Sequence, residues 1–151
     1  MLAQARDLCA FLDASPSPYH AVDEVRRRLV ARGFTELDEA APWPVQPGHH
    51  LVRRGGTLVA WSTAAPAQVA DGFRIVGAHT DSPNLRVKPR PDTGRAGWRQ
   101  LGVEVYGGVL LNSWLDRDLG LSGRVAVRSS SGNRVDVRLV RDDRPLLRVP
   151  Q

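Results

Sequence analysis

The first third of the chain carries apolar residues at helical spacing. From residue 2 to residue 14 they recur every three or four positions, which predicts an amphipathic helix covering a core, with Cys9 as a buried structural thiol. A second helix is predicted to begin at Ser17, a residue type that caps helix N-termini, and to run to about Arg32. Gly33 is its expected C-terminal cap, because glycine readily adopts the left-handed conformation that ends helices. The residues of this helix predicted to face inward are Val22, Val25 and Leu29.

A β-hairpin is predicted after the irregular, proline-rich residues that follow the second helix. Residues 51–54 and 57–61 flank Gly55-Gly56, and this connection suits a hairpin because both glycines accept positive φ. His49 and His50 stand at the start of the first strand. Adjacent strand residues point to opposite faces, so these two histidines are predicted to be surface residues and not joint metal ligands.

A third apolar run opens a stretch of ten residues, 75–84. The stretch begins with β-branched residues and is predicted to be a buried strand, and it ends in a polar turn at Pro83 and Asn84. Because alternate strand residues share a face, His79 and Asp81 are predicted to project to the same side where the strand ends.

Beyond Asn84 the chain alternates between apolar and polar residues. Four such segments predict the strands of a half-buried antiparallel sheet, and no helix is predicted among them: residues 85–89, 98–106, 122–128 and 134–139. A front part with helices and strands and an all-β back part predict a domain boundary near residue 85, with domains at 1–85 and 86–151. The fold class is therefore α/β, of α+β character within these residues.

Composition narrows the class of protein. The 151 residues are 42% hydrophobic and 25% charged, enough for one core of ordinary size or for pieces of two. No secretory signal and no membrane-spanning run is found, and the single cysteine cannot form an internal disulfide, so a cytoplasmic protein is expected. Residues 86–151 are basic, but their arginines are spread singly among apolar residues and glycines, which disfavours nucleic-acid binding.

The His79-Thr80-Asp81 triplet is the candidate for metal chemistry. A ligating histidine usually donates its second ring N–H to an acceptor, and a carboxylate two residues away is a plausible orienter or general base. The pattern is short, so a satisfied structural histidine remains the alternative. His20, in the first turn of the second helix, is better explained as a surface or capping-region residue than as a ligand.

Four motifs stand between residues 15 and 125 of the chain. They are Ser15-Pro16-Ser17-Pro18-Tyr19-His20-Ala21-Val22; Gly77-Ala78-His79-Thr80-Asp81-Ser82-Pro83 with Leu85-Arg86-Val87-Lys88-Pro89; Val103-Glu104-Val105-Tyr106-Gly107-Gly108; and Trp114-Leu115-Asp116-Arg117-Asp118-Leu119 with Leu121-Ser122-Gly123-Arg124-Val125. In this order and at about these separations they resemble the aspartyl aminopeptidases, a family of dinuclear zinc exopeptidases. The match departs at Asn84, where the family commonly has a cysteine.

The resemblance implies a function and a set of roles. His79 would be a zinc ligand and Asp81 the catalytic carboxylate that orients it, in an enzyme with two zinc ions that removes N-terminal aspartate or glutamate from peptides. Residues 1–85 would begin an α/β/α metallopeptidase sheet, and residues 86–151 would begin an inserted β-rich dimerisation domain. Family members form homo-oligomers through that inserted domain.

The resemblance also implies that much of the enzyme lies outside these residues. A catalytic zinc needs about three protein ligands, and only His79 is recognised here, so the chain is expected to be an N-terminal part that is inactive alone. Asp116 and Asp118 are favoured as members of a salt-bridged turn and not as substitute ligands. Two rival classes are a non-catalytic protein-interaction or oligomerisation module and a nucleic-acid binder that uses the basic back part.

Overall fold

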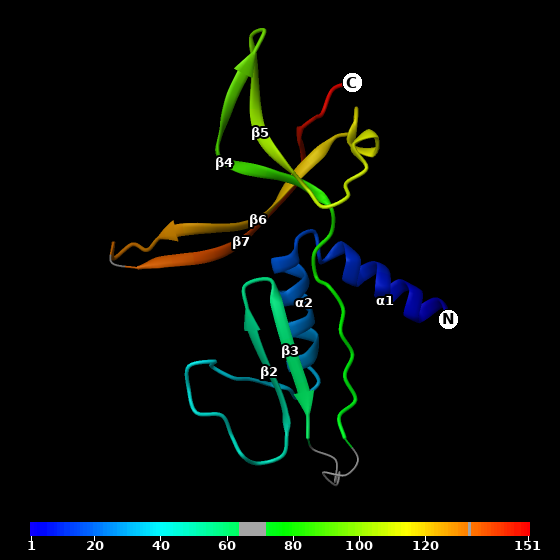
Figure 1. The fold of residues 1–151 in the computed structure, drawn as a ribbon, viewed down its shortest axis with the longest axis vertical. Helices are drawn as coiled ribbons and strands as arrows, with labels where there is room; N and C mark the ends of the chain where they lie inside the picture. Colours follow the sequence, from blue (N-terminus) through cyan, green and yellow to red (C-terminus); the bar gives the residue numbers. More distant parts are fainter. Residues whose placement is uncertain (64–71, 133) are drawn as a thin grey trace. The chain divides into compact units, whose positions relative to one another are not determined.

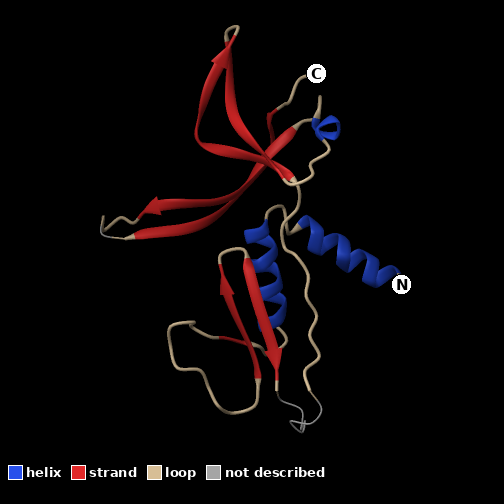
Figure 2. Ribbon diagram, in the orientation of Figure 1, coloured by secondary structure: helices blue, strands red, loops and turns tan. Residues whose placement is uncertain are grey.

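The helical and alternating patterns form a mixed α+β structure, as predicted (Figures 1 and 2). The computed structural model describes residues 1–63, 72–132 and 134–151. They divide into two compact units. The first unit comprises Met1–Asp81 and Leu121–Asp142, and the second comprises Ser82–Gly120 and Asp143–Gln151. The predicted boundary between domains at residues 85 and 86 remains a prediction.

Helix α2 (Pro18–Val30) follows the sequence prediction closely at both ends. Ser17 is extended and its hydroxyl accepts a hydrogen bond from the backbone N–H of His20, with Pro18 in the first turn. At the other end Gly33 has φ +87° and donates to the carbonyl of Val30, while the N–H of Phe34 donates to the carbonyl of Leu29. This pair of bonds is a Schellman motif, and it requires the left-handed residue that glycine supplies.

Helix α1 (Leu2–Asp13) does not cover a core, contrary to the prediction. None of its residues is buried, and the side chains of Leu2, Leu8 and Leu12 are exposed, as is Cys9. The helix contacts α2 through an ion pair between Arg28 and Asp7 and through the guanidinium of Arg28 over the ring of Phe11. The amphipathic pattern therefore predicted the apolar face of the helix correctly, but not that this face is exposed.

A small sheet packs against α2 and contains the core. Strands β1 (Thr35–Glu36), β2 (His49–Arg54) and β3 (Thr57–Ser62) are joined in that order, with β1 parallel to β2 and β2 antiparallel to β3 (Figure 1). Leu51 of β2 is 0% exposed and Val22 of α2 is 1% exposed. Burial of these two side chains, each worth about 1.5–3 kcal/mol, fixes the sheet to the helix.

The two histidines at the start of β2 differ from each other. His49 is exposed and lies beside the ring of Phe34, as expected of a surface residue. His50 is half-buried against Trp61, and both of its ring nitrogens are shielded from solvent without a hydrogen-bond partner. The prediction of a surface residue is wrong for His50, because the facing position on β3 is a large aromatic residue that covers it.

The apolar run at residues 73–77 is not a buried strand. Within the described part of the chain, residues 72–83 belong to no helix or strand (Figure 2). Ile75 is 88% exposed and Val76 is 97% exposed. A strand must share its backbone hydrogen bonds with a neighbouring strand. The described strands pair only with one another. Residues 73–77 therefore have the composition of a core strand but no strand to pair with among the described residues.

The second unit is built on one long hairpin. Strands β4 (Asn84–Arg95) and β5 (Trp98–Tyr106) pair antiparallel, with an irregularity between Val87 and Asp92. Ala96 and Gly97 form the turn, and both have positive φ, as tight hairpins of this twist require. A 3₁₀-helix, η2 (Leu111–Trp114), follows and was not predicted, because four residues are too few to show a helical period.

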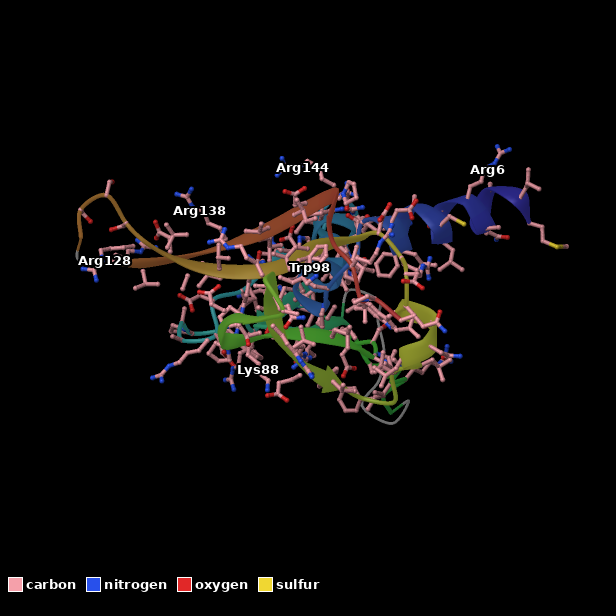
Figure 3. All side chains as sticks on the ribbon, turned by 90° about the horizontal axis from the view of Figure 1, so that it is seen from above. Arg6, Lys88, Trp98, Arg128, Arg138 and Arg144 are labelled. Carbon is pink, nitrogen blue, oxygen red and sulfur yellow. The ribbon has the colours of Figure 1, made fainter. Side chains whose placement is uncertain are left out.

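Strands β6 (Leu119–Arg128) and β7 (Val135–Leu147) form a second two-stranded sheet. All four predicted β segments of the back part are therefore strands, but they form two separate pairs and not one sheet. Figure 3 shows Arg128 of β6 and Arg138 of β7 extending from the ribbon as separate side chains. Of the predicted salt-bridged turn, Asp118 pairs with Arg148, while the backbone N–H of Asp116 donates to the carbonyl of Val149.

Candidate metal centre

The His79-Thr80-Asp81 triplet lies within residues 72–83, the segment that precedes β4 and belongs to no helix or strand. The hydroxyl of Thr80 donates a hydrogen bond of 2.6 Å to the carbonyl of Gly56, in the turn between β2 and β3. The triplet is therefore attached to the hairpin by a side chain and not by strand pairing. Pro83 and Asn84 then lead into β4, which begins at the predicted polar turn.

The imidazole of His79 and the carboxylate of Asp81 lie on the same side of the chain, as the i, i+2 spacing predicts. Nδ1 of His79 is 3.3 Å from Oδ1 of Asp81 and 2.8 Å from the backbone carbonyl oxygen of the same residue. The His79 side chain is 82% exposed and that of Asp81 is 41% exposed. The structure thus brings together the two residues that the sequence singled out.

The contact with the backbone carbonyl assigns a proton to Nδ1 of His79. A carbonyl oxygen can only accept a hydrogen bond, so Nδ1 is the donor in this contact. Nε2 is then the ring nitrogen that is left to bind a metal. A histidine held in this way, with Nδ1–H given to a backbone carbonyl and a carboxylate beside it, has the arrangement that zinc-ligating histidines commonly show.

The residues present fit one corner of a zinc site. An imidazole nitrogen and a nearby carboxylate are the chemistry that Zn²⁺ selects, and a catalytic zinc uses about three protein ligands. Among residues 1–63, 72–132 and 134–151, no group of three or more His, Cys, Asp and Glu side chains could hold a metal ion. His79 would therefore need partners beyond those that the structure describes.

His20 has a different role, in the cap of α2. Its Nδ1 lies 2.7 Å from Oγ of Ser17. Partial burial lowers the pKa of His20, and the positive charge of Arg141 lowers it further against an opposing effect of Asp23. A neutral imidazole at the N-terminus of a helix agrees with the capping role favoured from sequence.

Acidic and basic side chains of the first unit are largely paired with one another. Glu24 is 7% exposed and receives hydrogen bonds from Arg28 and Arg27; that from Arg28 is the main cause that lowers its pKa. Burial raises the pKa of Glu36, but hydrogen bonds from Arg26 and Arg53 outweigh this and lower it overall. Of these pairs, Arg26–Glu36 joins α2 to the sheet, whereas the Glu24 pairs lie within α2.

No pocket for an acidic substrate side chain is evident around these cations. A hollow on the hairpin is lined by Arg53 and Arg54, but their guanidinium groups are held by Glu36 and Glu39. Neither His79 nor Asp81 lines it. The described part of the chain therefore offers the metal-ligand corner without a recognised specificity pocket.

Sequence reasoning missed two residues next to the candidate centre, Thr80 and Gly56. Thr80 lies in one of the four motifs and Gly56 in the predicted hairpin turn, but the bond between them joins positions far apart in the chain. Only the fold of the hairpin brings that turn to the triplet.

Comparison with known sequences gives a consistent picture. A family model described as aminopeptidase I zinc metalloprotease (M18) matches residues 11–151. The chain is 55% identical over 152 residues to the probable M18 family aminopeptidase 2 of Mycobacterium leprae (strain TN), covering 100% of this chain and 36% of the relative. It is 59% identical over 145 residues to the protein of the same description from Streptomyces coelicolor, covering 96% and 32%. The chain thus spans about a third of the length of the curated relatives that it matches.

Solved structures show the same similarity in three dimensions. A chain of the cryo-EM structure of the Ape4 and Nbr1 complex matches with a TM-score of 0.91 at 42% identity, covering 97% of this chain and 29% of the other. The mApe1 dodecamer of S. cerevisiae matches with a TM-score of 0.89 at 29% identity, covering 97% and 35%. The motifs, the fold and the extent of the family match together show that the chain belongs to the M18 family, the aminopeptidase I zinc metalloproteases.

Proposed function

We propose that this chain supplies the first metal ligand, His79, and its orienting carboxylate, Asp81, to a zinc aminopeptidase that removes N-terminal aspartate or glutamate from peptides. The observation that carries the proposal is the contact of Nδ1 of His79 with the backbone carbonyl and the carboxylate of Asp81, which leaves Nε2 of an exposed ring for a metal. Membership of a zinc metalloprotease family supports the choice of metal and of reaction class.

The residues of the chain act by orientation. When bound, two zinc ions would polarise the scissile carbonyl and lower the pKa of a bound water. Asp81 accepts the hydrogen bond from Nδ1–H of His79, which fixes the orientation of the ring and makes Nε2 a stronger ligand for zinc. Its carboxylate also lies next to the candidate centre, where it can orient a nucleophilic water or hold a proton.

The chain alone is proposed to be inactive. It offers one recognised ligand of the three or more that a catalytic zinc requires, and the relatives it matches are about three times as long. The exposed apolar run at residues 73–77 supports the same view, because exposed apolar surface of this kind marks a place that another segment covers. Residues 1–85 would then belong to the catalytic domain and residues 86–151 to the inserted β domain.

A chimera tests the proposal directly. These 151 residues replace the matching segment of the Mycobacterium leprae relative, and release of aspartate from an N-terminal aspartyl peptide is measured with zinc present. We expect chelator-sensitive turnover by the chimera and none by the isolated chain. His79→Ala and Asp81→Ala should each remove turnover while the chimera keeps its circular dichroism and its assembly size. Full activity of either variant would disprove the assignment of residues.

Two further parts of the proposal have separate readouts. Acidic preference predicts that aspartyl and glutamyl peptides are cleaved faster than leucyl peptides, and equal rates would contradict it. Assembly into a homo-oligomer through the β domain is supported by the dodecameric state of the similar S. cerevisiae mApe1; sedimentation of the chimera tests it. A cytoplasmic location is proposed on the sequence alone, and the described residues contain no helix long and apolar enough to cross a membrane.

A non-catalytic interaction module is the second candidate. The exposed apolar side chains of β6 and β7 favour it, among them Val125, Val135 and Val137. This candidate predicts a defined oligomer of the isolated chain and no binding of zinc. Zinc-dependent turnover of the chimera that is lost in His79→Ala would exclude it.

A further inference from the structure

Thr80 lies between His79 and Asp81 in the chain, and its side chain makes a hydrogen bond to a different part of the fold. Its hydroxyl donates to the carbonyl of Gly56 at 2.6 Å. Residues 72–83 belong to no strand in the described structure, so no ladder of backbone bonds fixes the segment. The side chain of Thr80 instead attaches the segment to the hairpin turn, at the residue between His79 and Asp81.

The acceptor for Thr80 is a turn with little freedom to move. Gly55 has φ +59°, which only glycine adopts without strain. A Cβ added at Gly56 would lie 3.4 Å from Cβ of Pro18 and 3.7 Å from Cε1 of Tyr19. The turn is therefore seated directly on the first turn of α2, and the carbonyl that receives Thr80 has a fixed position.

The start of α2 is in turn covered by β6. The guanidinium of Arg124 lies 4.2 Å from the centre of the Tyr19 ring, and Oγ of Ser122 donates to the carbonyl of Pro16 at 3.2 Å. Three of the motifs found in the sequence thus meet at this turn: residues 15–22, 77–83 and 121–125. Their meeting gives a physical reason for motifs that offer no metal ligand themselves.

We propose that Thr80 is a positioning residue, which anchors the His79–Asp81 pair to the platform formed by Gly55-Gly56, Pro18 and Tyr19. The proposal rests on the proposed function, since the pair matters only if His79 binds metal. Loss of the hydroxyl would free the segment to rotate, and the imidazole would no longer be presented in one orientation. Because groups that orient a metal ligand are typically worth about 10–100-fold in metal affinity or activity, a loss of about 10-fold is expected.

The test compares three variants of the chimera. Thr80→Val removes the hydroxyl at nearly constant volume, and Thr80→Ser keeps it. Thr63→Val is the matched control, because Thr63 also exchanges hydrogen bonds with a glycine backbone, that of Gly48, at the opposite end of the same hairpin. We expect Thr80→Val to lower kcat and zinc affinity about 10-fold with KM changed less, Thr80→Ser to recover both to within about 3-fold, and Thr63→Val to change neither.

A second readout does not depend on turnover. In the isolated chain, the ¹⁵N chemical shifts of His79 should report the Nδ1–H tautomer for the wild type and for Thr80→Ser, and a mixture of tautomers for Thr80→Val. Equal kcat, zinc affinity and ¹⁵N shifts in Thr80→Val and Thr63→Val would overturn the inference, as would a folded Thr80→Ser that fails to recover. An active His79→Ala would instead overturn the proposed function, and the ¹⁵N shifts would still decide whether Thr80 orients the ring.

Discussion

Two regions of the first unit have the same apolar sequence pattern but differ in burial. In the body formed by α2 and the β2–β3 hairpin, Val22 and Leu51 are almost completely buried. In the segment at residues 73–77, Ile75 and Val76 are almost completely exposed. The difference shows that an apolar pattern indicates which segments need to be buried. Whether they are buried depends on the presence of another segment that packs against them.

The largest effect is expected at Leu51. Leu51→Ala removes a side chain with no exposed surface and should leave a cavity between the sheet and α2. A loss of about 2–5 kcal/mol in the free energy of unfolding is expected, measured by denaturant titration of the dilute isolated chain. A loss below about 1 kcal/mol would mean that α2 and the hairpin are not the stable body of this unit.

Ile75→Ala is the matching substitution in the exposed segment. In the isolated chain it should change the free energy of unfolding by less than about 0.5 kcal/mol, because Ile75 is already in solvent. In the chimera, where we expect further strands to pair with this segment, the same substitution should lower the unfolding temperature as a core substitution does. Equal, small effects in both proteins would show that the segment stays uncovered.

The paired charges around Glu24 should contribute less than Leu51. Glu24→Gln keeps the volume but weakens the bonds from Arg27 and Arg28, so a loss of about 1–3 kcal/mol is expected at pH 7. The pKa of Glu24 is lower in the folded chain than in the unfolded chain. Its stabilisation is therefore fully present above the unfolded value and is lost as the pH falls through the folded value.

A pH series supplies the control for that substitution. The difference in stability between wild type and Glu24→Gln should be constant near neutrality and shrink as the pH falls below about 4. A difference that grows toward acid would contradict the depressed pKa of Glu24.

A smaller effect than that of Glu24→Gln is expected at a pair of glycines. A Cβ at Gly33 or at Gly77 would meet no atom within 4 Å, but only Gly33 has positive φ. Gly33→Ala should therefore destabilise the isolated chain by about 1–2 kcal/mol through backbone strain at the end of α2, and Gly77→Ala by almost nothing. Similar values for the two would remove the Schellman motif as an explanation.

Much of the fold could be predicted because its signals are local. The cap at Ser17, the left-handed Gly33 and the glycine turn at 55–56 depend on the conformational preferences of single residues, and these are readable in sequence. The failures concern long-range packing. Cys9 on α1, His50 beside Trp61 and the exposed Ile75 each depend on which distant segment lies opposite, and the periodicity of a segment does not contain that information.

The candidate site shows the same division. His79 and Asp81 were predicted to face one side as residues of a strand; they do lie side by side, but in a segment that is not a strand, and the family resemblance supplied their proposed roles. The bond from Thr80 to Gly56 was not predictable, because it closes a loop between the hairpin turn and the extended segment. Among the described residues, no group of three or more His, Cys, Asp and Glu side chains could complete the proposed centre.

The discontinuity of the first unit has a consequence for synthesis on the ribosome. Met1–Asp81 emerges well before Leu121–Asp142, yet Ser122 and Arg124 from the later segment contact the residues around the start of α2. At about 5–20 residues per second, the contact between Tyr19 and Arg124 waits several seconds after Tyr19 leaves the peptidyl transferase centre. During that interval residues 15–22 of the nascent chain lack their contacts with Ser122 and Arg124. We expect a chaperone to bind this part of the chain most readily in that period.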